Sequence, residues 1–224
     1  MAKTVIWDVD GVIVDSAHYH FGSWQEVFKN RGISYNEEDF KKTFGQRNDA
    51  IIRTILGESV SQKEINSVAT EKEKSFRRRI RRNVKSLPGV IELMKALSEG
   101  GFIIALASST PRENVDLIIK NIGIDKYFQS IVADEDVTEG KPSPQVFLLA
   151  AKRLGVEPRD CVVIEDSVAG VTGAKRAGMS CLAVTNTHPR ISLTGADLIV
   201  DTLKTVTADD LERLINSQSD GGEA

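Results

Sequence analysis

The sequence has little cysteine and no long apolar run. Its two cysteines, Cys161 and Cys181, each precede a short apolar stretch, which is typical of small buried residues in a cytosolic protein, and we assign them no chemistry. No run is long enough to span a bilayer, and the N-terminus lacks the basic region and cleavage site of a signal peptide. These absences predict a cytoplasmic protein without a membrane partner.

An excess of positive charge is also absent. The formal net charge is -3 and the sequence pI is about 5.7, so the chain as a whole gives no electrostatic reason to bind nucleic acid or an anionic membrane. What the sequence does contain is 224 residues with 41% hydrophobic content, enough to bury a large core. We therefore expect one large domain, or one domain with an insertion, that does not bind nucleic acid.

Short apolar runs alternate with helical patterns along most of the chain. The runs with the composition of buried strands are 4–7, 102–107, 161–164 and 181–184, with weaker candidates at 198–200 and 131–132. Helices are expected after Pro88, from a capping box that starts at Thr110, from Ser143 to Gly155, and over 167–177. This alternation predicts an α/β fold with a parallel sheet covered on both faces.

The segment 16–84 interrupts this alternation. It contains no convincing buried strand and predicts four helices, the first carrying Phe21, Trp24 and Phe28 at helical spacing, the others over 39–44, 49–56 and 62–82. We interpret it as an all-helical insertion, so that 1–15 and 85–224 form a discontinuous core domain. The serine-rich, acidic tail 217–224 is expected to be disordered.

Two aspartates follow the first apolar run, in "KTVIWDVDGVIVD". Asp8 and Asp10 are two residues apart, so in an extended segment they point to the same side, at the end of the strand where open α/β sheets bind ligands. A buried carboxylate is costly unless it is paired or bound to a metal. Capping of the turn at Gly11 does not require two carboxylates, so this pair indicates a functional site.

A second acidic pair, Glu165-Asp166, ends the run 161–164. If both strand ends meet in one crevice, three or four carboxylates converge and either take up protons or recruit a cation. Oxygen ligands favour Mg²⁺. Ser108 and Ser109 end another strand before a helix, which is a natural anion site. Lys141, between a glycine and a proline, is well placed to meet a charge.

Together these groups form a site for phosphoryl transfer, with a nucleophilic carboxylate, a second carboxyl group, a metal, a hydroxyl and a lysine. The four motifs "DVDGVIVD", "LASS", "GKPSP" and "IEDSVAG" occur in this order over essentially the whole chain. In this combination the sequence resembles the haloacid dehalogenase (HAD) superfamily, in the branch with a helical cap that includes β-phosphoglucomutase and many sugar-phosphate phosphatases. The resemblance implies a Rossmann-like core.

The resemblance also implies a role for each motif residue. Asp8 would attack phosphorus and form an aspartyl phosphate, while Asp10 would exchange protons with the leaving oxygen and the incoming water. Ser108 and Lys141 would hold the phosphoryl group, with Ser109 close to the substrate. The implied Mg²⁺ ligands are Asp8, Asp166 and the backbone carbonyl of Asp10, with Glu165 in contact with the metal or one step removed.

Substrate selection is expected in the inserted helices. His20 matches a histidine that β-phosphoglucomutases carry near the cap hinge, and Lys72 stands roughly where those enzymes carry a partner lysine. The loop Gly45-Gln46-Arg47-Asn48 resembles the family's specificity loop, so Arg47 is the candidate for a substrate contact. Trp24 falls on the apolar stripe of its helix and is interpreted as cap core.

Phe44 before Gly45 and Gln46 before Arg47 depart from the mutase pattern, where lysine and serine are usual. The preferred interpretation is therefore a Mg²⁺-dependent phosphohydrolase for a small phosphorylated metabolite such as a sugar phosphate, acting as a monomer. A mutase of the β-phosphoglucomutase type is the alternative. A protein that only binds a phosphometabolite or nucleic acid is a third hypothesis, and the arginines of "FRRRIRR" could suggest nucleic-acid binding. We favour a different interpretation of these arginines, as part of a solvated helix face in which Glu73 pairs with Arg77 and Glu71 with Lys74.

Overall fold

A six-stranded parallel sheet forms the centre of the computed structural model, which describes residues 3–81 and 84–219. The strand order is β3-β2-β1-β4-β5-β6. The bounds are β1 Thr4–Trp7, β2 Ile103–Ala107, β3 Ser130–Val132, β4 Cys161–Glu165, β5 Ser180–Val184 and β6 Leu198–Val200. All six predicted strands are present, and the α/β fold class is confirmed. No helix within the described ranges is long and apolar enough to cross a membrane.

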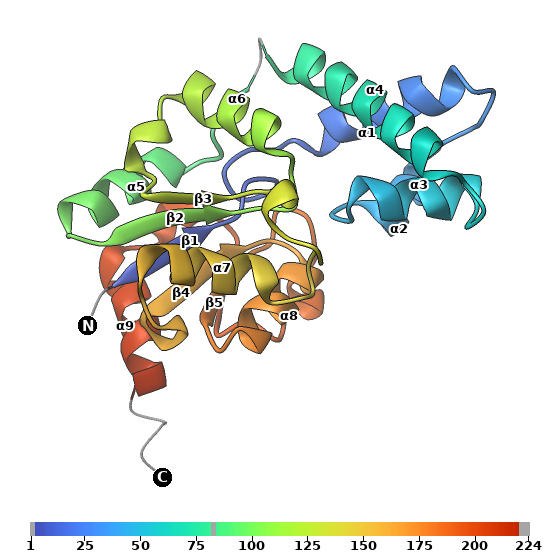
Figure 1. Cartoon of the computed structure of the whole chain (residues 1–224). Helices are drawn as coiled ribbons and strands as arrows, with labels where there is room; N and C mark the ends of the chain where they lie inside the picture. Colours follow the sequence, from blue (N-terminus) through green and yellow to red (C-terminus); the bar gives the residue numbers. More distant parts are fainter. Residues whose placement is uncertain (1–2, 82–83, 220–224) are drawn as a thin grey trace.

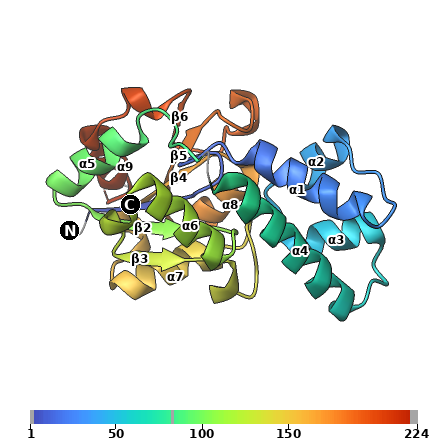
Figure 2. The ribbon, with the colours of Figure 1, turned by 90° about the horizontal axis from the view of Figure 1, so that it is seen from above.

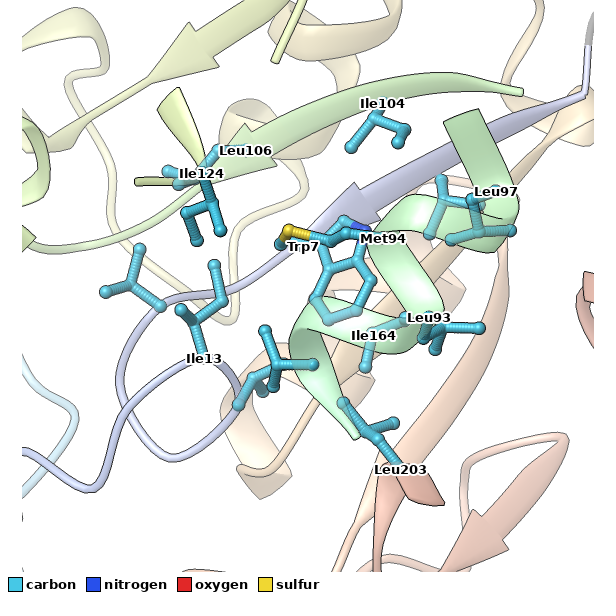
Figure 3. Packing of buried hydrophobic residues seen from close by; sticks show 14 of the residues in the cluster. Trp7, Ile13, Leu93, Met94, Leu97, Ile104, Leu106, Ile124, Ile164 and Leu203 are labelled. Carbon is cyan, nitrogen blue, oxygen red and sulfur yellow. The ribbon is translucent and has the colours of Figure 1, made fainter. Parts of the chain in front are cut away.

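Helices cover both faces of this sheet (Figure 1). The helices that pack on one face are α5 (Val90–Glu99), α6 (Arg112–Ile122) and α9 (Ala208–Ser219), and those on the other are α7 (Gln145–Leu154) and α8 (Val168–Arg176). Neighbouring side chains of β1 alternate between the faces, so Trp7 packs in the first cluster and Ile6 in the second. Figure 3 shows the Trp7 ring beside Met94 of α5. Burying each aliphatic side chain of this core contributes about 1.5–3 kcal/mol.

The helices of segment 16–84 form a second group with its own core. They are α1 (Ala17–Lys29), α2 (Glu37–Thr43), α3 (Asn48–Leu56) and α4 (Gln62–Ile80), and short 3₁₀ helices elsewhere cover Asp125–Tyr127, Asp134–Asp136, Pro158–Asp160, Arg190–Ser192 and Leu203–Thr205. Trp24 and Phe28 are buried in this second core, as predicted. Figures 1 and 2 both place these four helices beyond the carboxyl ends of the strands. The domain boundaries at 15/16 and 84/85 stay a prediction.

Two local predictions were wrong, and one helix was not predicted. The α6 helix has Pro111 at its N-cap, and the Thr110 hydroxyl donates to Asp10 instead of capping the helix. A helix that we did not predict, α9, includes Ser217 to Ser219 of the expected disordered tail; residues 220–224 lie outside the described residues. Thr207 and Asp210 form reciprocal hydrogen bonds at the start of α9, and Leu211 and Ile215 bury its apolar face. The capping pair three residues apart and the apolar pair four residues apart were the sequence signals that could have predicted α9.

The predicted salt bridges of the arginine-rich helix α4 were also wrong. Glu73 is buried and faces Lys72, and Glu71 pairs with Arg31 of the cap. Arg78 and Arg79 instead pair with Glu26 of α1. The basic stretch is thus used in part to hold two cap helices together, which the residue spacing within α4 could not show because the partners are distant in sequence.

Candidate active site

The parallel register brings the motif residues together. Trp7 of β1 is level with Ile164 of β4 and Leu106 of β2, so Asp8 emerges beside Glu165 and close to Ser108. The Asp8 backbone N–H continues the ladder by donating to the Ile164 carbonyl (3.1 Å). One cavity contacts side chains from the sheet ends and from the cap, and its lining includes Asp8, Asp10, His20, Lys72, Ser108, Ser109, Lys141, Glu165 and Asp166.

Lys141 connects two strand ends from the loop before α7. Its Nζ lies 2.7 Å from Asp8 Oδ1 and 2.5 Å from Glu165 Oε1, and all three side chains are almost inaccessible to solvent. Burial disfavours the Lys141 ammonium, but the carboxylates of Asp8 and Glu165 outweigh burial and raise the pKa of this lysine. Lys141 therefore stays a fixed positive charge beside Asp8, as the motif predicts.

Three buried carboxylates form an acidic cluster. Asp8, Glu165 and Asp166 each offer an oxygen within 4.8 Å of the other two. Burial raises the pKa of Asp8 to about 7, although Lys141 opposes this shift, and burial next to Glu165 and Asp8 raises the pKa of Asp166 well above its usual value. These shifts show that one lysine does not balance the cluster. The oxygen-only donor set fits a hard divalent cation such as Mg²⁺, for which these three side chains are the candidate ligands.

Glu165 and Asp166 differ in their remaining contacts. Glu165 Oε2 accepts from the Asp166 and Ser167 backbone N–H groups (2.8 and 2.9 Å) and from the Ser167 hydroxyl (2.9 Å). Although burial opposes ionisation, Lys141 and these donors lower the pKa of Glu165. Asp166 accepts from the Thr187 hydroxyl. Glu165 therefore has its oxygens largely engaged by the protein, which leaves Asp166 as the freer ligand.

Two glycines give these carboxylates their space. Gly11 has a φ of +76°, and a Cβ there would lie 1.7 Å from Asp166 Oδ2. A Cβ on Gly170 of α8 would lie 1.8 Å from Glu165 Oε1. Neither gap leaves room for a methyl group, so the turn after β1 and the first turn of α8 both require glycine.

Asp10 faces away from the acidic cluster and toward three donors. Its carboxylate accepts from the hydroxyls of Ser16 and Thr110 and lies 3.2 Å from His20 Nε2. Burial opposes ionisation of this group, but the contacts with His20, Ser16 and Thr110 outweigh it and hold the pKa of Asp10 well below its usual range. Its side chain is outside the carboxylate cluster; coordination through its backbone carbonyl stays a prediction.

His20 links Asp10 to the cap lysine. Lys72 Nζ, which can only donate, lies 2.9 Å from His20 Nδ1, so Nδ1 is an acceptor and Nε2 carries the proton that faces Asp10. Burial and the nearby Lys72 charge lower the pKa of His20, which agrees with this neutral tautomer. The structure thus joins the two cap residues that the sequence singled out, and their role in substrate binding stays a prediction.

Arg47 is the predicted substrate residue that the structure places elsewhere. Its Nε lies 3.2 Å from Asp134 of the core, and Nη1 donates to the Val137 and Thr138 carbonyls at 3.4 Å. The loop around it does reach the cavity, through Gly45, Gln46 and Asn48. In this structure, therefore, Arg47 contacts the core beside the cavity, and its contact with a substrate stays a prediction.

Sequence reasoning missed several polar neighbours of the site. Ser16 and Thr187 orient Asp10 and Asp166, and Asn48 and Glu73 line the cavity from the cap. Ser16 follows the first motif directly and could have been noticed. Thr187 lies 21 positions after Asp166 in an irregular segment, where no periodicity marks it.

Comparison with known proteins agrees with this geometry. Residues 5–184 match the family model described as haloacid dehalogenase-like hydrolase. The chain is 33% identical to the β-phosphoglucomutase of Bacillus subtilis, with 88% of each chain covered, and 32% identical to a phosphorylated carbohydrates phosphatase of Thermotoga maritima, with 79% of this chain and 82% of the relative covered. The crystal structure of β-phosphoglucomutase from Clostridium difficile superposes with a TM-score of 0.87 at 27% identity, covering 97% and 98% of the two chains.

Buried acids gathered at the carboxyl ends of a parallel sheet, beneath a group of helices, define an α/β enzyme of the Rossmann-like class with a helical cap. With the match over residues 5–184, the chain belongs to the haloacid dehalogenase-like hydrolases. This confirms the family suggested by the four motifs.

Proposed function

We propose that this protein is a Mg²⁺-dependent phosphohydrolase that acts on a small phosphorylated metabolite, a sugar phosphate, through an aspartyl phosphate on Asp8. The observation that carries the proposal is the division between the first two aspartates. Asp8 contacts Lys141 within the acidic cluster, whereas Asp10 is held toward Ser16, Thr110 and His20 in the same cavity. This division supports our assignment of attack on phosphorus to Asp8 and of proton transfer to Asp10.

Asp8 and Asp10 together can carry out both halves of the hydrolysis. On binding, Asp10 takes the proton of a phosphate monoester monoanion; Asp8 then attacks phosphorus, the ester P–O bond breaks, and the leaving oxygen receives that proton. In the second half, water gives a proton to Asp10 and attacks phosphorus, and the Asp8–phosphorus bond breaks. Asp10 then passes the proton from water to the inorganic phosphate, which leaves as the monoanion H2PO4⁻ together with the alcohol, so Asp8 and Asp10 return to their ionised starting forms.

The other site residues hold the phosphoryl group. Lys141 and the hydroxyl of Ser108 offer donors beside Asp8, and Ser109 lines the same end of the cavity. The acidic cluster of Asp8, Glu165 and Asp166 would hold Mg²⁺, which when bound would offset charge on the phosphoryl oxygens. We also propose that the enzyme is monomeric and cytoplasmic.

Substrate access requires the cap to move. The cavity measures about 70 Å³, whereas pockets for small organic ligands measure roughly 300–1,000 Å³. Arg47 reaches the core carbonyls of Val137 and Thr138, so the cap loop contacts the core in the described state. We infer that the cap opens to admit the substrate and closes on it.

A phosphosugar mutase of the β-phosphoglucomutase type is the second candidate. It is supported by the 33% identity to such an enzyme and by the contact of His20 with Lys72. Phe44 and Gln46 in the cap loop favour the phosphatase. A protein that only binds its ligand is less well supported, because the acidic cluster and the Asp8–Lys141 pair have no evident task in binding alone.

The test is turnover of phosphorylated sugars and p-nitrophenyl phosphate with and without Mg²⁺, with β-glucose 1-phosphate and a bisphosphate activator included. Release of inorganic phosphate that depends on Mg²⁺ supports the phosphatase. Isomerisation without net phosphate release supports the mutase. Absence of both reactions, with retained binding of phosphorylated ligands, supports a binding protein.

A further inference from the structure

The cap-side wall of the cavity contains one cation and one anion that neutralise each other. Lys72 Nζ and Glu73 Oε1 are 2.7 Å apart, and their side chains are only 3% and 8% exposed. Both residues line the cavity, together with Asn48 and the apolar side chains of Trp24 and Phe44. The Lys72 charge is therefore already matched, and its ammonium also contacts His20 and lies over the Trp24 and Phe76 rings.

Arg47 does not add an available positive charge to this wall. It is absent from the cavity lining, and its guanidinium faces the carboxylates of Asp134 and Asp49 at 3.2 and 3.6 Å. At the sheet end, Lys141 is occupied by Asp8 and Glu165. Among the described lining residues, the cap side thus has no unmatched cation for a second anionic group.

Glu73 is held in place as a charged acceptor. One carboxylate oxygen accepts from Asn48 Nδ2 (2.7 Å), and the other accepts from the side-chain amide of Asn114 on α6. Burial opposes ionisation, but the Lys72 ammonium and the Asn48 amide outweigh it and lower the pKa of Glu73. A substrate hydroxyl can donate to such a carboxylate, whereas a phosphate or carboxylate beside it would be repelled.

We propose that Glu73 selects substrates that carry a single phosphate and an otherwise uncharged, hydroxyl-bearing body, and that it rejects a second anionic group at the cap end. This inference rests on the proposed function, because it assigns the substrate class of the same site. It also separates the two candidate reactions. A phosphorylated enzyme that returns its phosphoryl group to a sugar monophosphate forms a bisphosphate, so a mutase must hold a second phosphate, and this wall disfavours one.

The experiment compares matched substrates with the Mg²⁺-loaded enzyme: fructose 1-phosphate with fructose 1,6-bisphosphate, and glucose 6-phosphate with glucose 1,6-bisphosphate. In the wild type, we expect kcat/KM for the monophosphate to exceed that for the bisphosphate by about tenfold or more, which corresponds to about 1.4 kcal/mol. Glu73→Gln keeps the shape and removes the charge, and should reduce this ratio at least about threefold. Asn48→Asp adds a second carboxylate to the wall and should increase it.

Glu71→Gln is the matched control, because Glu71 lies two positions earlier on the same helix and pairs with Arg31 at the surface. It should leave the ratio unchanged. Equal or better turnover of the bisphosphates by the wild type overturns the proposal. A wild-type preference that survives Glu73→Gln, or that Glu71→Gln reduces equally, shows that Glu73 does not set it.

Binding separates failure of this proposal from failure of the proposed function. In the Asp8→Asn variant, calorimetric titration should show the same order of affinity for each pair of ligands without any turnover. If the wild type hydrolyses none of these substrates, yet the monophosphates bind the variant more tightly than the bisphosphates, the proposed function fails and the selectivity stands. If the bisphosphates bind equally well or better, the selectivity is overturned even where hydrolysis is observed.

Discussion

The two ends of the cavity differ in how their charges are balanced. At the sheet end several carboxylates face one lysine, and the charged groups there are Asp8, Asp10, Glu165, Asp166 and Lys141. At the cap end, Lys72 and Glu73 match each other. The sheet end therefore needs further positive charge, and the cap end needs none. The sheet end therefore suits a phosphoryl group with its metal, and the cap end suits an uncharged group.

The largest expected effect is loss of the nucleophile at the sheet end. Asp8→Asn should lower kcat by on the order of 10⁴-fold or more, because an amide cannot form the acyl phosphate. Steady-state release of phosphate is the measurement, with mass spectrometry to exclude deamidation. Asp15→Asn, an exposed neighbour, should retain activity. Clear turnover by a verified Asp8→Asn sample would remove Asp8 as nucleophile.

Metal affinity distinguishes the two acids that follow β4. Asp166→Ala should weaken Mg²⁺ binding by on the order of 100-fold, and Glu165→Ala should weaken it less, because the oxygens of Glu165 are already engaged by Lys141 and Ser167. Calorimetric titration without substrate measures both, with the exposed Glu99→Ala as control. Equal or reversed losses would show that the two roles are assigned the wrong way round.

Mg²⁺ binding should strengthen as pH rises from 6 to 8. The pKa of Asp8 is raised to about 7 and that of Asp166 is also raised, so protons compete with the metal below that pH. Affinity should change by roughly tenfold per pH unit for each proton displaced.

The raised pKa of Asp8 also determines how the stability of the fold changes with pH. The folded pKa of Asp8 lies above its ordinary value of 3.8, so its stabilising contribution is lost as pH rises through 7. Without metal the protein should melt at a lower temperature at pH 8 than at pH 6, and Mg²⁺ should raise the melting temperature most at pH 8. Melts at three pH values with and without Mg²⁺ test this. A Mg²⁺ effect independent of pH would contradict it.

The smallest effect is expected at the boundary between the two ends. Arg47→Ala removes contacts with Asp134 and two core carbonyls, worth about 1 kcal/mol, so kcat/KM should fall about fivefold through weaker cap closure. Mono- and bisphosphates should suffer alike, as should p-nitrophenyl phosphate. If only substrates with a second anionic end lose activity, Arg47 contacts the substrate, as its loop position first suggested.

The sequence predicts the sheet end of the cavity better than the cap end. Asp8 and Asp10 follow one strand and Glu165 and Asp166 follow another, and strands in a parallel sheet end at the same edge, so local pattern predicts their meeting. The boundaries of most helices are equally local, because glycines such as Gly155 end them in the left-handed conformation. The missed helix α9 had a readable capping pair, which we overlooked beside its polar tail.

The fold class and the family, both confirmed, and the residues proposed to react could all be predicted from the sequence, because each depends on short runs whose period or motif needs no distant partner. Which charges remain available to a ligand depends on the tertiary structure. Glu73 was expected to pair along its own helix with Arg77, yet it is buried against its neighbour Lys72 and against Asn48 and Asn114 from other parts of the chain. Arg47 was expected to contact the substrate, and in this structure it faces Asp134 of the core. Long side chains choose partners by proximity in space and by burial, and neither can be read from residue spacing.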